Sequence, residues 1–282
     1  MTSNDRILKI GICDWTLKMV QNTNVFQKAK ALGFDGVQVA LDIKNTNKSL
    51  LNEKAQESYK KYSVQYNIPI CSCAAVNFMQ NPLVISDDPV SIFLDYTKAM
   101  KNLGIKKILL PFSGVGDINS RTTLISSIQR SIRRMPPKDK MLDKTIEILK
   151  QFADIAEDAQ ITVGLETKMS AETLRVILDK IGSQNIKVYY DAGNAHFMGY
   201  NIFDEVKLLG MNDICEIHLK ESYTTIGAGK IDYKNFLELL IAEGYKDWLI
   251  IEVSKNRFLG LEGSMKKNVS YLKGLMRQEL TA

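Results

Sequence analysis

The sequence predicts a (β/α)8 TIM barrel, an α/β fold of eight parallel strands and eight helices, as a single domain over residues 1–282. Short runs rich in branched and aromatic residues recur along the chain, and amphipathic segments of helical period separate them. A length of 282 residues with 45% hydrophobic residues suits one barrel, which commonly has about 250 residues. In the second half, four successive strand-like runs each end in a polar residue.

The strands are predicted from apolar runs that begin and end at turn residues or helical patterns. The first run is ILKIGIC, and the last, WLIIEV, closes the series. Because helices separate the runs, the strands should be parallel and covered by helices on the outside. The expected strands are 7–13, 33–40, 68–76, 105–112, 161–166, 186–191, 214–219 and 248–253.

Local start and stop signals predict the helices. Gly33 follows the first helix, where a left-handed C-cap residue is needed. Asp87, Asp88 and Pro89 provide acidic residues and a proline at the start of a helix that ends near Gly104. The expected helices are 25–32, 51–66, 89–103, 142–159, 171–180, 203–209, 233–243 and 261–277.

A basic insertion interrupts this rhythm after the fourth strand, at about residues 113–140. It is longer than the few residues that usually join a strand to a helix. One interpretation is a lid over the active rim whose basic residues meet an anionic substrate. The alternative is a surface helix whose arginines face water.

Composition favours a soluble, cytoplasmic protein and says little about its partners. The net charge of +5 is spread along the chain and gives no concentrated surface for nucleic acid. There is no signal-peptide core and no apolar run of membrane-spanning length. The cysteines are expected to be buried and reduced, with Cys71 and Cys73 on the same side of one strand.

Four polar residues at strand ends predict a metal site. Glu166, Asp191, His218 and Glu252 are separated by 25, 27 and 34 residues, each about one β/α unit. This spacing brings their side chains to one rim of the barrel, where barrel enzymes place their chemistry. Taken singly, each carboxylate would be read as a helix N-cap or a surface group, and the histidine as structural. Together they indicate ligands of one divalent ion.

The ligand types indicate the metal and the chemistry. Three oxygen donors and one imidazole suit Mn²⁺ first, with Mg²⁺, Co²⁺ or Zn²⁺ as alternatives. Such an ion would acidify a C–H next to a chelated carbonyl through a metal-stabilised enediolate. Glu166 and Glu252 would then be the catalytic bases. Proton transfer across one carbon gives epimerisation, transfer between neighbouring carbons gives aldose–ketose isomerisation, and loss of a β-hydroxyl gives dehydration of a keto sugar or inosose.

Several motifs in order resemble the xylose isomerase-like barrel superfamily of sugar phosphate isomerases and epimerases. They are IGICDWTLK, GFDGVQV, VGLET, YYDAGN, HLKE followed by IGAGKIDY, and LIIEVS. In that superfamily, ketose 3-epimerases bind one divalent metal through Glu, Asp, His and Glu at the ends of strands five to eight. The resemblance implies that role for Glu166, Asp191, His218 and Glu252.

The same resemblance implies substrate contacts. Glu172 matches a substrate-binding position, although it also reads as an acidic residue at a helix start. The family's substrate-binding histidine lies where Asn194 stands here, and His196 lies two residues later. Glu221 matches a carboxylate of the pattern, but Thr224 replaces an arginine.

The first half would form the other wall of the pocket. Trp15, Asn77 and Phe112 follow strands one, three and four, where aromatic rings stack on sugars or cap the core.

Rival classes fit less well. The presence of only two histidines argues against a multinuclear zinc endonuclease, and no GxGxxG motif supports a nicotinamide enzyme. A non-catalytic sugar-binding barrel stays open. The oligomeric state also stays open, although apolar residues of an outer helix could serve a subunit contact in a homo-oligomer, namely Phe93, Tyr96 and Met100.

Overall fold

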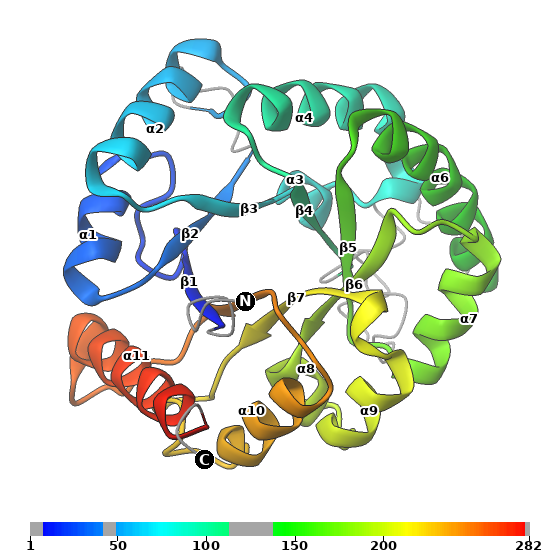
Figure 1. The fold of residues 1–282 in the computed structure, drawn as a ribbon. Helices are drawn as coiled ribbons and strands as arrows, with labels where there is room; N and C mark the ends of the chain where they lie inside the picture. The colour runs from blue at the N-terminus through cyan, green and yellow to red at the C-terminus, as the bar shows by residue number, and fades with distance from the viewer. Residues whose placement is uncertain (1–7, 42–48, 113–137, 280–282) are drawn as a thin grey trace.

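The chain forms a closed barrel of eight parallel strands inside a ring of helices, as the computed structural model shows (Figure 1). The structure describes residues 8–41, 49–112 and 138–279. Each strand pairs with the next, and β1 pairs with β8 to close the sheet. The strands are β1 Lys9–Cys13, β2 Gly36–Ala40, β3 Ile70–Ala74, β4 Lys107–Pro111, β5 Thr162–Glu166, β6 Ile186–Asp191, β7 Ile214–Leu219 and β8 Trp248–Ile251.

Helices surround this barrel and confirm the expected alternation (Figure 1). The α-helices are α1 Asn24–Leu32, α2 Glu53–Tyr66, α3 Asn77–Gln80, α4 Pro89–Leu103, α6 Lys138–Ala159, α7 Ala171–Ile181, α8 Ala192–Phe197, α9 Ile202–Leu209, α10 Tyr233–Ala242 and α11 Gly260–Glu279. The 3-10 turns η2 Leu83–Ile85 and η4 Met211–Asp213 were not predicted, and neither were the short helices α3 and α8. The predicted insertion at about 113–140 lies mostly outside the described residues, and its last residues begin α6.

Helix ends follow the sequence signals. Gly33 ends α1 in the left-handed conformation with φ of 87°, and its N–H reaches the carbonyls of the last turn. Asp88 caps α4 by accepting a hydrogen bond from Ser91 N at 2.9 Å, and Pro89 is the first helical residue. A proline at this position costs no backbone hydrogen bond, because an N–H in the first turn has no partner within the helix.

The barrel carries two apolar cores. The larger core lies between strands and helices, and it includes fully buried Phe93, Tyr96 and Met100 of α4. The expectation that these three side chains serve a subunit contact is therefore wrong, because α4 turns them inward against its own chain. The smaller core fills the barrel interior with Cys13, Ala74, Leu109, Tyr189, Cys215 and Ile250.

The cysteines are free thiols, as expected, but two of them lie on different sides of β3. Cys71 packs against the interior core and Cys73 belongs to the outer core. A shift of register between β2 and β3 at Val37 and Gln38 breaks the alternation of side chains. The prediction that both thiols share one side fails because a bulge changes the period locally.

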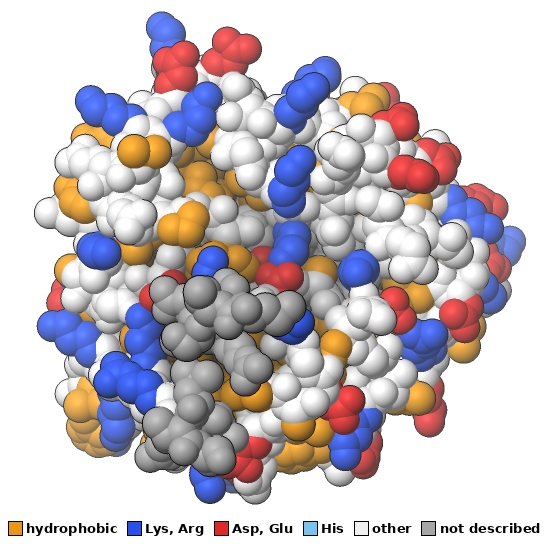
Figure 2. Space-filling view, in the orientation of Figure 1, with side chains coloured by type: hydrophobic (Ala, Val, Ile, Leu, Met, Phe, Trp, Pro, Cys, Tyr) orange, Lys and Arg blue, Asp and Glu red, His pale blue; other side chains and the backbone are white. Residues whose placement is uncertain are grey.

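The outer surface in Figure 2 carries basic and acidic side chains interspersed over the ring of helices. None of the helices in the described part of the chain combines the length and hydrophobicity that a membrane-spanning segment needs.

Candidate metal centre

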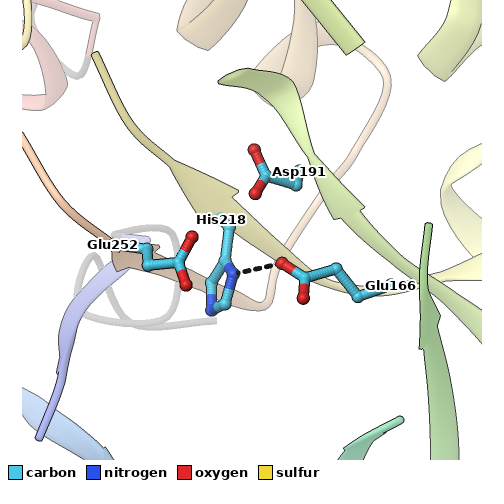
Figure 3. A group of neighbouring side chains, drawn as sticks. All are labelled: Glu166, Asp191, His218 and Glu252. Atoms are coloured by element: carbon cyan, nitrogen blue, oxygen red, sulfur yellow. Dashed lines mark hydrogen bonds and ion pairs between the residues drawn. The ribbon is translucent and has the colours of Figure 1, made fainter. Parts of the chain in front are cut away.

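The four polar residues predicted as ligands meet at one place. Glu166 and Asp191 end β5 and β6, His218 is near the end of β7, and Glu252 directly follows β8. One donor atom from each residue lies within 4.8 Å of the other three. Figure 3 shows the side chains pointing toward one another, with the two glutamates on either side of His218. They meet because parallel pairing sets the strand ends side by side, with Asp191 opposite His218 in the ladder.

His218 is the buried centre of the cluster. Its side chain is fully buried, and its Nδ1 lies 2.9 Å from Glu166 Oε1 (Figure 3). Burial alone would lower the pKa of His218, but the hydrogen bond to Glu166 and the neighbouring carboxylates raise it overall. The surrounding carboxylates therefore stabilise the protonated form of the ring against the effect of burial.

Lys220 also belongs to the cluster, although it was not among the residues predicted from the sequence. Its ammonium lies 2.6 Å from Asp191 Oδ2 and 2.8 Å from Glu252 Oε2. The lysine follows His218 by two residues and comes directly after β7, so the strand period, continued by one residue, places both side chains on the same side. That period was the available signal. A methyl group at Gly193 would overlap the Lys220 side chain, so the glycine of DAGN makes room for the lysine of HLKE.

The ammonium of Lys220 partly balances the carboxylates. Burial raises the pKa of Asp191 to about 7, with Glu166 and Glu252 adding to the effect and Lys220 opposing it. Burial would also raise the pKa of Glu252, but His218 and Lys220 lower it overall. The cluster thus concentrates negative charge and already holds one cation against it.

The donor set fits a divalent ion. Three carboxylates and one imidazole converge in a partly buried site, which is the ligand chemistry of Mn²⁺ and similar ions. Glu166, Asp191, His218 and Glu252 are the residues that would hold it.

A family model described as "Xylose isomerase-like TIM barrel" matches residues 26–275 of the chain. The chain belongs to this family. A protein of Haemophilus influenzae provisionally named as an L-ribulose-5-phosphate 3-epimerase is 27% identical over 271 residues. That match covers 87% of this chain and 88% of the relative.

Solved structures share the fold of this xylose isomerase-like barrel. The 3-keto-D-glucoside 4-epimerase of Escherichia coli superposes with a TM-score of 0.75 at 14% identity, over 95% of this chain and all of the other. The D-psicose 3-epimerase of Clostridium cellulolyticum H10, solved with D-tagatose, gives a TM-score of 0.69 at 18% identity. It covers 97% of this chain and 96% of that one. At these identities, the likeness shows the fold alone.

Two of the residues predicted to bind substrate contact the cluster through hydrogen bonds. The Trp15 indole Nε1 donates to Glu252 Oε1 at 3.1 Å, and the ring stands edge-on to His218. The backbone N–H of Asn194 donates to Asp191 Oδ1 at 2.8 Å, so Asp191 also caps α8. His196 lies in the same short helix, half-buried, with its ring beside Phe197.

The other predicted substrate residues have different neighbours. Glu172 is exposed in the first turn of α7, and Asn77 begins α3 and accepts a hydrogen bond from Asn81. Phe112 places its ring in the outer core, and its N–H donates to the Glu166 carbonyl at 2.8 Å. Buried Glu221 accepts a hydrogen bond from the N–H of Ile231 at 3.0 Å. Substrate contact by these four residues remains a prediction.

Proposed function

We propose that this xylose isomerase-like barrel is a divalent-metal-dependent epimerase or isomerase of keto sugars or their phosphates. The observation that carries the proposal is the pair of carboxylates on either side of His218 (Figure 3). Inversion at a carbon next to a carbonyl requires one base on each face of the substrate, and we assign these two roles to Glu166 and Glu252. The provisional name of the Haemophilus influenzae relative supports a ketose phosphate as the substrate.

The protein's residues divide the work. A bound divalent ion would supply Lewis-acid polarisation of the substrate carbonyl. Glu252 is held by hydrogen bonds from Trp15 and Lys220, whereas Glu166 contacts the His218 ring in the metal-free cluster. One glutamate would remove the proton next to the carbonyl, and the other would return a proton to the opposite face. The indole ring of Trp15 would limit access of water on the side of Glu252.

Deuterium incorporation tests this function. Wild-type protein with Mn²⁺ is incubated in D2O with a panel of ketoses and ketose phosphates, and the products are examined by NMR. We expect deuterium at a carbon next to the carbonyl of one substrate, together with its epimer or aldose isomer. Loss of water from the substrate would instead indicate the dehydratase. Sugar binding without deuterium incorporation would show a barrel that only binds.

Two matched variants assign the bases. Glu166→Gln and Glu252→Gln keep an oxygen for the metal but remove the base, so each should slow turnover by about 100-fold or more. Glu238→Gln, on α10, is the control and should leave turnover unchanged. Metal content is measured for each variant. Full activity in both Gln variants with metal retained would exclude this mechanism.

A further inference from the structure

A line of buried polar side chains runs through the barrel interior from the metal centre. Gln38 of β2, Ser72 of β3, Glu216 of β7 and His218 have no exposed surface. Tyr189 of β6 lies among them and is 1% exposed. Polar groups buried this deeply must find partners, since each unpaired one costs stability.

Gln38 is the branch point of this network. Its amide nitrogen donates to Ser72 Oγ at 3.1 Å and to the Tyr189 hydroxyl at 2.8 Å. Its amide oxygen accepts from the Cys13 thiol at 3.2 Å and lies 2.8 Å from His218 Nε2. An amide oxygen has no proton to give, so the hydrogen bond to His218 exists only if Nε2 carries the proton.

The orientation of the Gln38 amide is fixed from the other end of the line. The Tyr189 hydroxyl donates its proton to Glu216 Oε2 at 2.8 Å, which leaves its oxygen to accept from Gln38. Glu216 Oε1 lies 3.7 Å from the ammonium of Lys107, which also pairs with Asp247. A reversed amide would set the oxygen of Gln38 against the oxygen of Tyr189, with no proton between them.

We propose that Gln38 is a positioning residue that keeps His218 protonated at Nε2. The lone pair of Nδ1 is then available to bind the metal ion together with Glu166, Asp191 and Glu252. Tyr189 and Glu216 act one step further away, by fixing the direction of the Gln38 amide. This inference rests on the proposed metal site. Removing a hydrogen-bond partner of a metal-binding histidine commonly lowers metal affinity by about 10- to 100-fold.

The ring nitrogens of His218 give a direct test, because the chain contains only two histidines. Protein labelled with ¹⁵N-histidine is loaded with diamagnetic Zn²⁺, and the ring nitrogens are assigned through their couplings to the ring protons. We expect His218 to carry a slowly exchanging proton on Nε2 and none on Nδ1. A ring with its proton on Nδ1 would overturn the proposal.

Variants separate positioning from simple packing. Gln38→Met keeps a similar volume without the acceptor, so it should lose the protected Nε2 proton and weaken Zn²⁺ binding about 10- to 100-fold. Gln38→Glu restores the acceptor and should recover the protected proton and most of the affinity. Tyr189→Phe should show a smaller loss in the same direction. Unchanged Zn²⁺ affinity and an unchanged ring spectrum in Gln38→Met would refute the role of Gln38.

Tyr190→Phe is the matched control. Tyr190 is adjacent to Tyr189, but it lies in the outer core, and its hydroxyl has no hydrogen-bond partner among the described residues. This variant should keep the wild-type ring spectrum and Zn²⁺ affinity. If Gln38→Met does not fold, the wild-type spectrum and the comparison of Tyr189→Phe with Tyr190→Phe still test whether Gln38 positions His218.

Failure of the proposed function would look different. If wild-type protein binds no divalent ion, the proposed metal site is wrong. The ring spectrum of the metal-free protein would still show whether His218 carries a proton on Nε2. Metal binding by wild type with His218 protonated at Nδ1 would overturn only the role of Gln38.

Discussion

At the scale of single residues, charge balance decides how the cluster behaves without metal. Asp191 and Glu252 each face the Lys220 ammonium, and all three side chains are mostly buried. Removing one partner from such a group leaves uncompensated charge in a medium that solvates it poorly. A metal ion bound by the cluster would therefore stabilise the same carboxylates as Lys220.

The Lys220→Met variant tests whether Lys220 and a bound metal ion stabilise the same carboxylates. We expect the metal-free variant to lose about 3–5 kcal/mol of unfolding free energy, because two buried carboxylates lose their cation. Added Mn²⁺ should raise the melting temperature of the variant more than that of wild type. The measurement is thermal unfolding in EDTA and in excess Mn²⁺.

Lys98→Met is the control for this variant, because the Lys98–Asp95 pair lies on the surface with both side chains more than half exposed. Surface pairs contribute less than about 1 kcal/mol. The charge-balance account fails if Lys220→Met is no less stable than Lys98→Met.

At the scale of elements, the loops after β7 and β8 are tied together beside the cluster. The N–H of Glu221 donates to Ser254 Oγ at 2.7 Å. Asn268 of α11 donates to the Ser254 carbonyl and accepts from the N–H of Ile226. These contacts let α11 hold both loops, and they place Lys220 and Glu252 relative to each other.

Gly229→Ala tests this loop packing. A methyl group at Gly229 would overlap the carboxyl group of Glu221, which holds the loop through Ile231. We expect a loss of about 1–3 kcal/mol in unfolding free energy, measured by urea denaturation.

Gly274→Ala provides the opposite expectation for the same chemical change. Gly274 lies inside α11, and its added methyl would meet nothing within 4 Å. Alanine is favoured over glycine in a helix interior, so this variant should gain about 0.5–1 kcal/mol. Equal effects of the two substitutions would contradict the packing at Gly229.

At the scale of the whole molecule, buried acids should make stability depend on pH. Burial raises the pKa of Asp14 and of Glu216 to about 7, and Asp191 behaves in the same way. Because the folded protein holds these protons more tightly than the unfolded chain, unfolding free energy should fall as pH rises from about 4 to about 7. At pH 7 these groups are half ionised, so the loss continues to about pH 8.

Asp14→Asn isolates one of these groups. Asp14 has no exposed surface and accepts a hydrogen bond from the N–H of Ala40 at 3.1 Å, which an asparagine oxygen would preserve. Between pH 5 and pH 8 the variant should lose roughly 3 kcal/mol of the pH dependence, about two pKa units at 1.4 kcal/mol each. Urea denaturation in EDTA at pH 5 and pH 8 measures it. The same dependence in both proteins would show that Asp14 is ionised when folded.

The sequence by itself determined the number and order of the strands, the helices between them and the residues of the cluster. The spacing of apolar residues and the residues that cap helices are local signals, so each strand or helix can be predicted from its own segment of the sequence. Glu166, Asp191, His218 and Glu252 could be grouped because strand ends in a parallel barrel must share one rim.

Only the tertiary structure decided which side chains touch across the barrel. Gln38 and His218 are 180 residues apart, and their contact depends on strand register and on the bulge at β3, which no local pattern records. The packing of α4 was likewise decided only by the tertiary structure. The sequence pattern shows that Phe93 lies on an apolar face of the helix, but not whether the core of the same chain or a partner subunit covers that face. Long-range packing settles such contacts, since it depends on how all the elements fit together rather than on any one of them.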